Sequence, residues 1–232
     1  MRSFISKIEH FYKLNTNIPG EIQFSPGIQE LRIPLYQREF KWTNEKIAEL
    51  IKDINSRDKF LGIIILDEHV SHYEIVDGQQ RITTCYLALL CLYNLYKGHF
   101  REQSSINGLI RPYNNQFVLK NESIGDYITV ADSIMEITIQ DDADVYYQRD
   151  DFLRAYTQIY EILSGFTEWE QLRAFKQKLL DSQFLVLVND TQNNTRPVEQ
   201  VFLDINEKSQ LLEQADIFKG HCFKNYGNEY AD

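Results

Sequence analysis

The order of hydrophobic and polar residues predicts short strands and one helix near the start of the chain. Apolar and polar residues alternate over residues 21–33, and Pro26-Gly27 and Pro34 interrupt them, as is typical of short strands or a hairpin. Residues 44–55 have the spacing of a helix that begins after Thr43 or Asn44 as its cap. Its apolar positions are Ile47, Leu50, Ile51 and Ile54.

The next segment predicts two strands followed by a long helix. Residues 61–66 form an apolar run with the length of a buried strand. A turn over residues 67–71 leads to a second strand over 72–76, which ends at Asp77-Gly78. A helix is predicted from Gln79 to about residue 97, so the order is strand, turn, strand, helix.

The second half of the chain predicts mainly helices. Residues 98–121 are rich in Asn, Gly and Ser and are predicted to be a loop. Helices are predicted over residues 150–163 and 169–180, and a short buried strand over 184–188. A last helix is predicted after Pro197, where Pro favours a helix start.

These elements predict a single α/β (α+β) domain over residues 1–232. Strands occur in the first and last thirds of the chain, so the sheet core is expected over about residues 20–100 and 181–220. A helical insertion is expected between them, over about residues 101–180, with helices also at the C-terminal end.

Composition is that of a soluble globular protein in the cytoplasm. The chain has 232 residues, of which 43% are hydrophobic and 25% charged, enough to bury a sizeable core. The longest apolar stretch, residues 82–96, is too short and too polar to span a bilayer, and no secretion signal precedes it. Cys85, Cys91 and Cys222 have no paired spacing, which favours reduced thiols.

The formal net charge of −10 weighs against one class of function. Proteins hold duplex DNA largely by neutralising phosphates with Lys and Arg, so an acidic domain is a poor candidate for binding DNA alone. Contact with DNA is therefore expected through another domain or a partner.

The segment Asp77-Gly78-Gln79-Gln80-Arg81 lies between a predicted strand and a predicted helix. Unpaired N–H groups and the helix dipole make such a helix start an anion site, and phosphate is its usual ligand. Gly78 permits a positive φ, and the planar guanidinium of Arg81 suits phosphate oxygens. A second interpretation is an ordinary Asp-Gly turn with Asp77 as a helix cap and Arg81 solvated. The chain contains no G-x-x-x-x-G-K-[ST] loop.

Two histidines form the remaining candidate for a metal site. His69 and His72 are three positions apart on the predicted turn, and no third ligand is expected nearby, which disfavours metal binding.

Four ordered blocks resemble the DGQQR family, whose best-described members are GmrSD-type restriction enzymes. They are IPLYQREFKW (33–42), FLG (60–62), YEIVDGQQRITT (73–84) and FLDINEK (202–208), the last followed by Leu211 or Leu212, Asp216 and Lys219. The family usually has Gly shortly after the Asn of the last block, whereas Lys208-Ser209-Gln210 stands here, which puts that turn in doubt.

The resemblance implies a ParB- and sulfiredoxin-like fold that binds a nucleoside triphosphate and hydrolyses it with Mg²⁺. It places the phosphates on Gly78, Gln79, Gln80 and Arg81, with Tyr36, Gln37, Arg38, Asn206 and Lys219 as further nucleotide ligands. Asp77, Arg81 and Arg38 are the expected catalytic residues, and Asp77 is also the expected Mg²⁺ ligand. Asp216 and Lys219 have an alternative role as a buried pair that closes the domain.

Three functions remain open from the sequence. The first is an NTPase module that regulates a DNA-cleaving restriction and antiphage system, the second a ParB-like nuclease or nickase, and the third a non-catalytic sensor of nucleotide or modified DNA. The net charge disfavours the second. The family's usual HNH nuclease domain has no counterpart in this sequence, so effector activity is expected outside it. The preferred base, the DNA modification sensed and the oligomeric state are left open.

Overall fold

Six strands form one mixed sheet in the computed structural model, which describes residues 2–14, 23–34, 40–56, 60–121 and 151–190. The sheet order is β1-β6-β3-β4-β2-β5. The strands are β1 (Arg2–Lys7), β2 (Leu31–Ile33), β3 (Phe60–Glu68), β4 (Tyr73–Asp77), β5 (Leu119–Asn121) and β6 (Gln183–Asp190). The described helices are α1 (Ile8–Phe11), α2 (Asn44–Asn55), α3 (Gln79–Leu95), α4 (Phe100–Ile110), α7 (Asp151–Ser164) and α8 (Trp169–Asp181). The predicted α/β class is confirmed.

Strands that are far apart in the chain are neighbours in the sheet. β6 pairs with β1 in antiparallel and with β3 in parallel orientation. β3 and β4 form an antiparallel hairpin, and β2 lies parallel to both β4 and β5. Central parallel strands are buried on both faces, which explains why β3 and β6 are apolar along most of their length.

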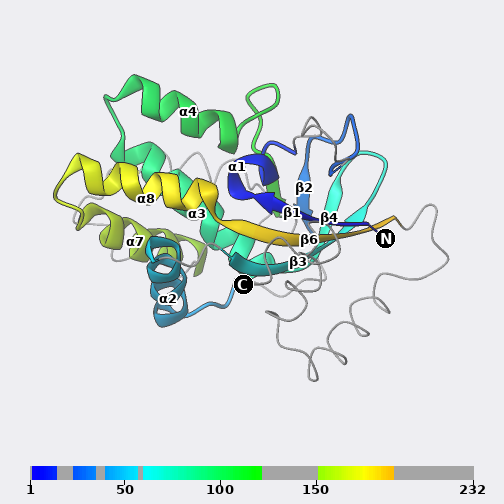
Figure 1. Cartoon of the computed structure of the whole chain (residues 1–232), viewed down its shortest axis with the longest axis horizontal. Helices are drawn as coiled ribbons and strands as arrows, with labels where there is room; N and C mark the ends of the chain where they lie inside the picture. The colour runs from blue at the N-terminus through cyan, green and yellow to red at the C-terminus, as the bar shows by residue number, and fades with distance from the viewer. Residues whose placement is uncertain (1, 15–22, 35–39, 57–59, 122–150, 191–232) are drawn as a thin grey trace, which may run out of the picture.

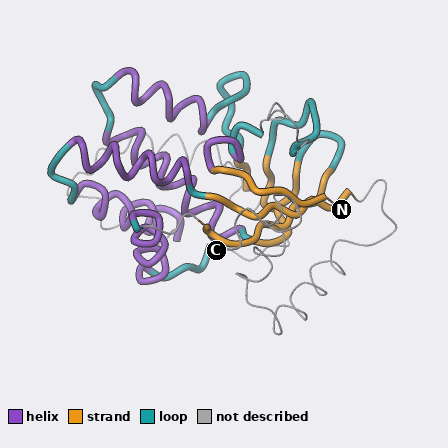
Figure 2. Tube along the Cα trace, viewed as in Figure 1, coloured by secondary structure: helices purple, strands orange, loops and turns teal. Residues whose placement is uncertain are grey.

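The main hydrophobic core joins one face of the sheet to the helices. Leu61, Ile64 and Leu66 of β3 share this core with α3, which is buried almost all round. A helix without a polar face packs within a core rather than on a surface. The opposite face of the sheet carries a smaller cluster of Ile63, Ile65, Val76, Leu185 and Leu187. Figures 1 and 2 show α2, α7 and α8 in one half of the molecule and most of the sheet in the other.

The thiols of α3 agree with the predicted reduced state. Cys85 and Cys91 are free and fully buried. Burial raises the pKa of Cys85 to about 12, so its thiol stays protonated and unreactive at neutral pH. Within the described residues, no helix is both long and apolar enough to cross a bilayer.

Two regions differ from the prediction. Residues 98–121 were predicted to be a loop, which is wrong, because they contain α4 and β5. The many polar residues of α4 resemble a loop, but Ile106, Leu109 and Ile110 are buried on one side of this helix. No element was predicted for the first residues, which supply β1 and α1. The helix predicted after Pro197 lies outside the described residues.

Candidate functional site at the start of α3

The turn at Gly78 joins β4 directly to α3. Gly78 has φ 92° and ψ 5°, a left-handed conformation that a residue with a side chain rarely adopts. A Cβ atom placed there would lie 2.2 Å from Ile64 Cδ1 and 3.3 Å from the Ile63 carbonyl oxygen. The carbonyl of Gly78 accepts the N–H of Ile82 at 3.0 Å, which closes the first helical turn. Glycine is therefore needed both for the backbone conformation and for close contact with β3.

Arg81 lies in this first turn and is half-buried. Its Nη1 donates a hydrogen bond to the carbonyl of Ile63 at 3.0 Å. A guanidinium has five N–H donors, so this single bond orients the side chain and leaves further donors. The first turn contains no acidic residue. Arg81 and the positive end of the helix dipole would therefore both attract an anion.

Asp77 is the last residue of β4 and is also half-buried. Its carboxylate makes no hydrogen bond or ion pair with any other residue that the structure describes. The helix N-cap is Gly78, which has no side chain. The interpretation of Asp77 as the helix cap is thus not supported by a hydrogen bond, and the residue directly precedes the N-cap of α3.

Gln80 connects the turn at Gly78 to the end of the IPLYQREFKW block (residues 33–42), which precedes α2. Its side-chain Oε1 accepts the backbone N–H groups of Lys41 at 2.8 Å and Trp42 at 3.2 Å. Both Gln79 and Gln80 are buried. The end of the IPLYQREFKW block is therefore fixed next to the start of α3.

A second set of contacts holds this block from α7. Arg154 donates to the carbonyl of Trp42 at 2.8 Å and to the side chain of Asn44. Asp151 forms ion pairs with Lys41 at 3.2 Å and with Arg154 at 3.4 Å. The segment before α2 is therefore held by α3 on one side and by α7 on the other.

The remaining predicted ligands fall on parts of the chain that are not described. These are Tyr36, Gln37, Arg38, Asn206 and Lys219, together with Asp216. The structure brings Asp77, Gly78, Gln79, Gln80 and Arg81 together, and the roles of all the others stay predictions.

The β3–β4 hairpin contains a group of residues that the sequence did not predict. His69, His72 and Glu74 offer possible metal-ligand atoms that all lie within 4.8 Å of one another. The expectation that no third ligand lies near the histidines is wrong, because β4 begins directly after the turn and carries Glu74 back alongside them. The signal was present as His-x-x-His-x-Glu, but its meaning depends on the hairpin register.

The comparisons with known proteins identify the family of the chain. A search of curated proteins found no significant match. A family model described as the GmrSD restriction endonuclease, N-terminal domain, matches residues 20–223. This match covers most of the 232 residues and includes every described part of the site at α3. The chain therefore belongs to the family of GmrSD restriction endonuclease N-terminal domains.

Proposed function

We propose that this domain binds a nucleoside triphosphate at the Gly78 turn and hydrolyses it in the presence of Mg²⁺. The nucleotide state would regulate DNA cleavage by the restriction system to which the family belongs. The observation that carries this proposal is the position of the oriented guanidinium of Arg81 in the first turn of a helix that begins at Gly78.

The geometry of α3 supports phosphate binding at its N-terminus. The helix has no acidic residue in its first turn, and the dipole at a helix N-terminus favours an anion. Gly78 allows the left-handed turn that starts α3 directly after β4. Arg81 is already ordered by the Ile63 carbonyl, so little side-chain entropy would be lost on binding. Each charge-assisted hydrogen bond to phosphate would contribute about 1.5–3 kcal/mol.

Asp77 fits the requirements of a Mg²⁺ ligand next to bound phosphates. Mg²⁺ in nucleotide sites is held by one or two carboxylates together with phosphate oxygens and water. Asp77 directly precedes the N-cap of α3, and its carboxylate has no ion pair within the described residues. A bound Mg²⁺ would neutralise charge on the phosphates.

The hydrogen bonds of Gln80 support a contribution of the IPLYQREFKW block to phosphate binding. They fix Lys41 and Trp42, which follow Arg38 by three and four positions, beside the helix start. Arg38 would be a further ligand of the same phosphates, as the resemblance to the family implies. Catalysis would then depend on positioning and on stabilising charge on the transferred phosphoryl group.

Calorimetric titration with ATP, GTP, CTP and UTP in the presence of Mg²⁺ tests this proposal. We expect wild type to bind at least one of them and Arg81→Ala to lose most of that affinity. Arg101→Ala, which removes an exposed arginine of α4, is the matched control and should bind like wild type. Phosphate release should fall in Asp77→Asn if its carboxylate holds Mg²⁺.

Two outcomes of the titration would contradict nucleotide binding at the Gly78 turn. Absence of binding to wild type would reject a nucleotide site in this chain and favour the DNA-sensing role. Equal losses in Arg81→Ala and Arg101→Ala would place the phosphates elsewhere. Thermal melts of all the variants separate a loss of binding from a loss of fold.

A further inference from the structure

We propose that the β3–β4 hairpin binds a divalent transition-metal ion, with Zn²⁺ as the best match. His69, His72 and Glu74 would be the ligands, and Asp67 would be the fourth. The hairpin lies at the opposite end of β4 from Gly78, so the inference does not rest on the proposed nucleotide site.

The hairpin holds its candidate ligands in a small volume. The N–H of His69 donates to the carbonyl of His72 at 2.9 Å, which closes a turn of two residues. The two imidazole rings stack with their centroids 4.7 Å apart. Ligand atoms of His69, His72 and Glu74 lie within 4.8 Å of one another. Zn²⁺ bonds of about 2.0–2.2 Å would bring such atoms to about 3.3 Å, a change that side-chain rotation can supply.

Asp67 completes the set from the other strand of the hairpin. It pairs with Glu74 across β3 and β4, so both carboxylates start from the same level of the sheet. Its Oδ2 lies 3.5 Å from Nε2 of His69. Its Oδ1 accepts a hydrogen bond from Nδ2 of Asn189 on β6 at 3.1 Å. Such a bond from outside the ligand set orients a carboxylate ligand.

The ring nitrogen of His69 gives independent support for a ligand. Its Nε2 is buried but makes no hydrogen bond. The nearest acidic oxygens are those of Asp67 at 3.5 Å and Glu74 at 3.8 Å. A buried polar atom without a partner is costly, and a metal ion between these three groups would satisfy it.

A neighbouring hydroxyl orients the ring of His72 for metal binding. Its Nδ1 lies 3.2 Å from the hydroxyl of Ser71, which can accept Nδ1–H and leave Nε2 available.

The chemistry of the donors selects the kind of ion. Two imidazoles with carboxylates suit Zn²⁺ and related transition metals, whereas Mg²⁺ and Ca²⁺ prefer oxygen ligands alone.

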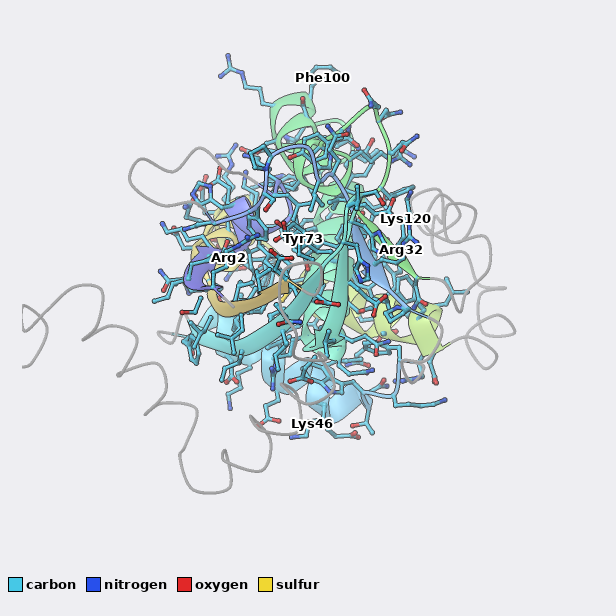
Figure 3. The ribbon with its side chains drawn as sticks, turned by 90° about the vertical axis from the view of Figure 1, so that its right-hand side faces the viewer. Arg2, Arg32, Lys46, Tyr73, Phe100 and Lys120 are labelled. Carbon is cyan, nitrogen blue, oxygen red and sulfur yellow. The ribbon has the colours of Figure 1, made fainter. Side chains whose placement is uncertain are left out.

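Two cations lie beside the hairpin on the neighbouring strands. Arg32 on β2 pairs with Glu74 on β4, and Lys120 on β5 pairs with Arg32. Arg32 and Lys120 are labelled in Figure 3 and both form ion pairs with Glu30. The positive charges beside the hairpin are therefore partly neutralised.

Zinc titration of the whole chain after chelator treatment tests the proposal. We expect one Zn²⁺ to bind, with a rise in melting temperature, because a ligand that binds only the folded state stabilises it. His69→Gln and His72→Gln should each weaken binding by at least about tenfold. His99→Gln, an exposed histidine next to Trp169, is the matched control and should bind like wild type.

Competition and a double variant separate the alternatives. Excess Mg²⁺ or Ca²⁺ should not displace Zn²⁺, and the His69→Gln/His72→Gln double variant should lose the zinc-dependent rise in melting temperature. The proposal is overturned if wild type shows no such rise, or if the double variant keeps it. If His69 only pairs with the two carboxylates, its loss would lower the melting temperature equally with and without zinc. Nucleotide binding by these variants should be unchanged, so failure here leaves the proposed function standing.

Discussion

Gly78 meets two requirements of the fold, a left-handed backbone and a close approach to β3. Its φ of 92° already disfavours any other residue, and a Cβ would lie 2.2 Å from Ile64 Cδ1. The tip of Ile64 can shift, but the Ile63 carbonyl and Ile64 Cα, at 3.3 and 3.4 Å, are backbone atoms. Gly78→Ala is therefore expected to lower the free energy of unfolding by about 1–3 kcal/mol, measured by urea denaturation.

Gly108 provides the matched control for this prediction. It lies in α4, and no atom stands within 4 Å of where its Cβ would be. Gly108→Ala should raise the free energy of unfolding by about 0.5–1 kcal/mol, because alanine is the better helix former. If the two substitutions change stability in the same direction, the packing of Gly78 against β3 does not control the turn.

Gln80 is expected to act through the segment that it holds. Gln80→Ala removes the acceptor of two backbone N–H groups, those of Lys41 and Trp42. Leaving such donors without a partner costs about 1–3 kcal/mol of stability. Gln177→Ala, which loses only an exposed contact with Asp181, should change stability by less than about 0.5 kcal/mol. Equal effects in urea denaturation would contradict the role given to Gln80.

Single residues also mark how far the sequence could predict the site. The strand, Asp-Gly turn and helix were predicted because each has a local signal in residues 73–95. The sequence did not predict the hydrogen bond from Arg81 to Ile63, which joins residues 18 positions apart. It also did not predict the bonds from Lys41 and Trp42 to Gln80, which join residues 38–39 positions apart. Glu74 was missed although it lies only two residues after His72, because its place beside both histidines depends on how the hairpin pairs.

Helices α4 and α8 are joined by an acidic residue whose charge state matters. Glu102 on α4 accepts a hydrogen bond from Lys176 and lies 3.7 Å from Arg173 on α8. The Lys176 hydrogen bond, followed by the nearby positive charges, lowers the pKa of Glu102 below its usual 4.5. A lowered carboxyl pKa adds stability that is complete above about pH 4.5 and is lost as the pH falls through the folded-state pKa.

Glu102→Gln is therefore expected to be less stable than wild type near pH 7, by about 0.5–1 kcal/mol, since the pair is only partly buried. The difference should be smaller at pH 3 than at pH 7, because the wild-type carboxyl becomes protonated as the pH falls below 4.5. Urea denaturation of both proteins at the two pH values measures it. Glu170→Gln, which affects a highly exposed contact with Arg173, should give little difference at either pH. A wild-type advantage that persists unchanged at low pH would contradict the assignment.

Among the elements, a strong local apolar pattern decided which ones could be predicted. α2, α7 and α8 have apolar residues at helical spacing, α3 is a long apolar run after the Asp-Gly turn, and β3 and β6 are apolar runs of strand length. α4 was missed because its polar residues resemble a loop, and it is a helix because Ile106, Leu109 and Ile110 are buried. The place of β6 between β1 and β3 comes from pairing across the whole chain, which no local pattern specifies.

The molecule as a whole separates two candidate sites along one strand. β4 begins beside the histidine hairpin and ends at Gly78, so each site lies at one end of the strand. The β3–β4 hairpin is held to β1 by Arg2. Its guanidinium donates a hydrogen bond to the hydroxyl of Tyr73 and forms an ion pair with Glu68. Arg2 and Tyr73 are labelled in Figure 3.

Charge over the whole chain leads to the last prediction, which concerns DNA. The net charge is −10, and the neighbouring cations Arg32 and Lys120 are both paired with Glu30. This chain alone is therefore expected to bind duplex DNA no more tightly than about 10 μM near physiological salt, within the range of non-specific binding. Fluorescence anisotropy of labelled duplexes, with and without nucleotide, measures this. Glu30→Gln should raise the residual affinity at low salt if these cations face the DNA. Tight binding by wild type, with a steep salt dependence, would contradict the prediction and assign direct DNA recognition to this domain instead of to the remainder of the restriction system.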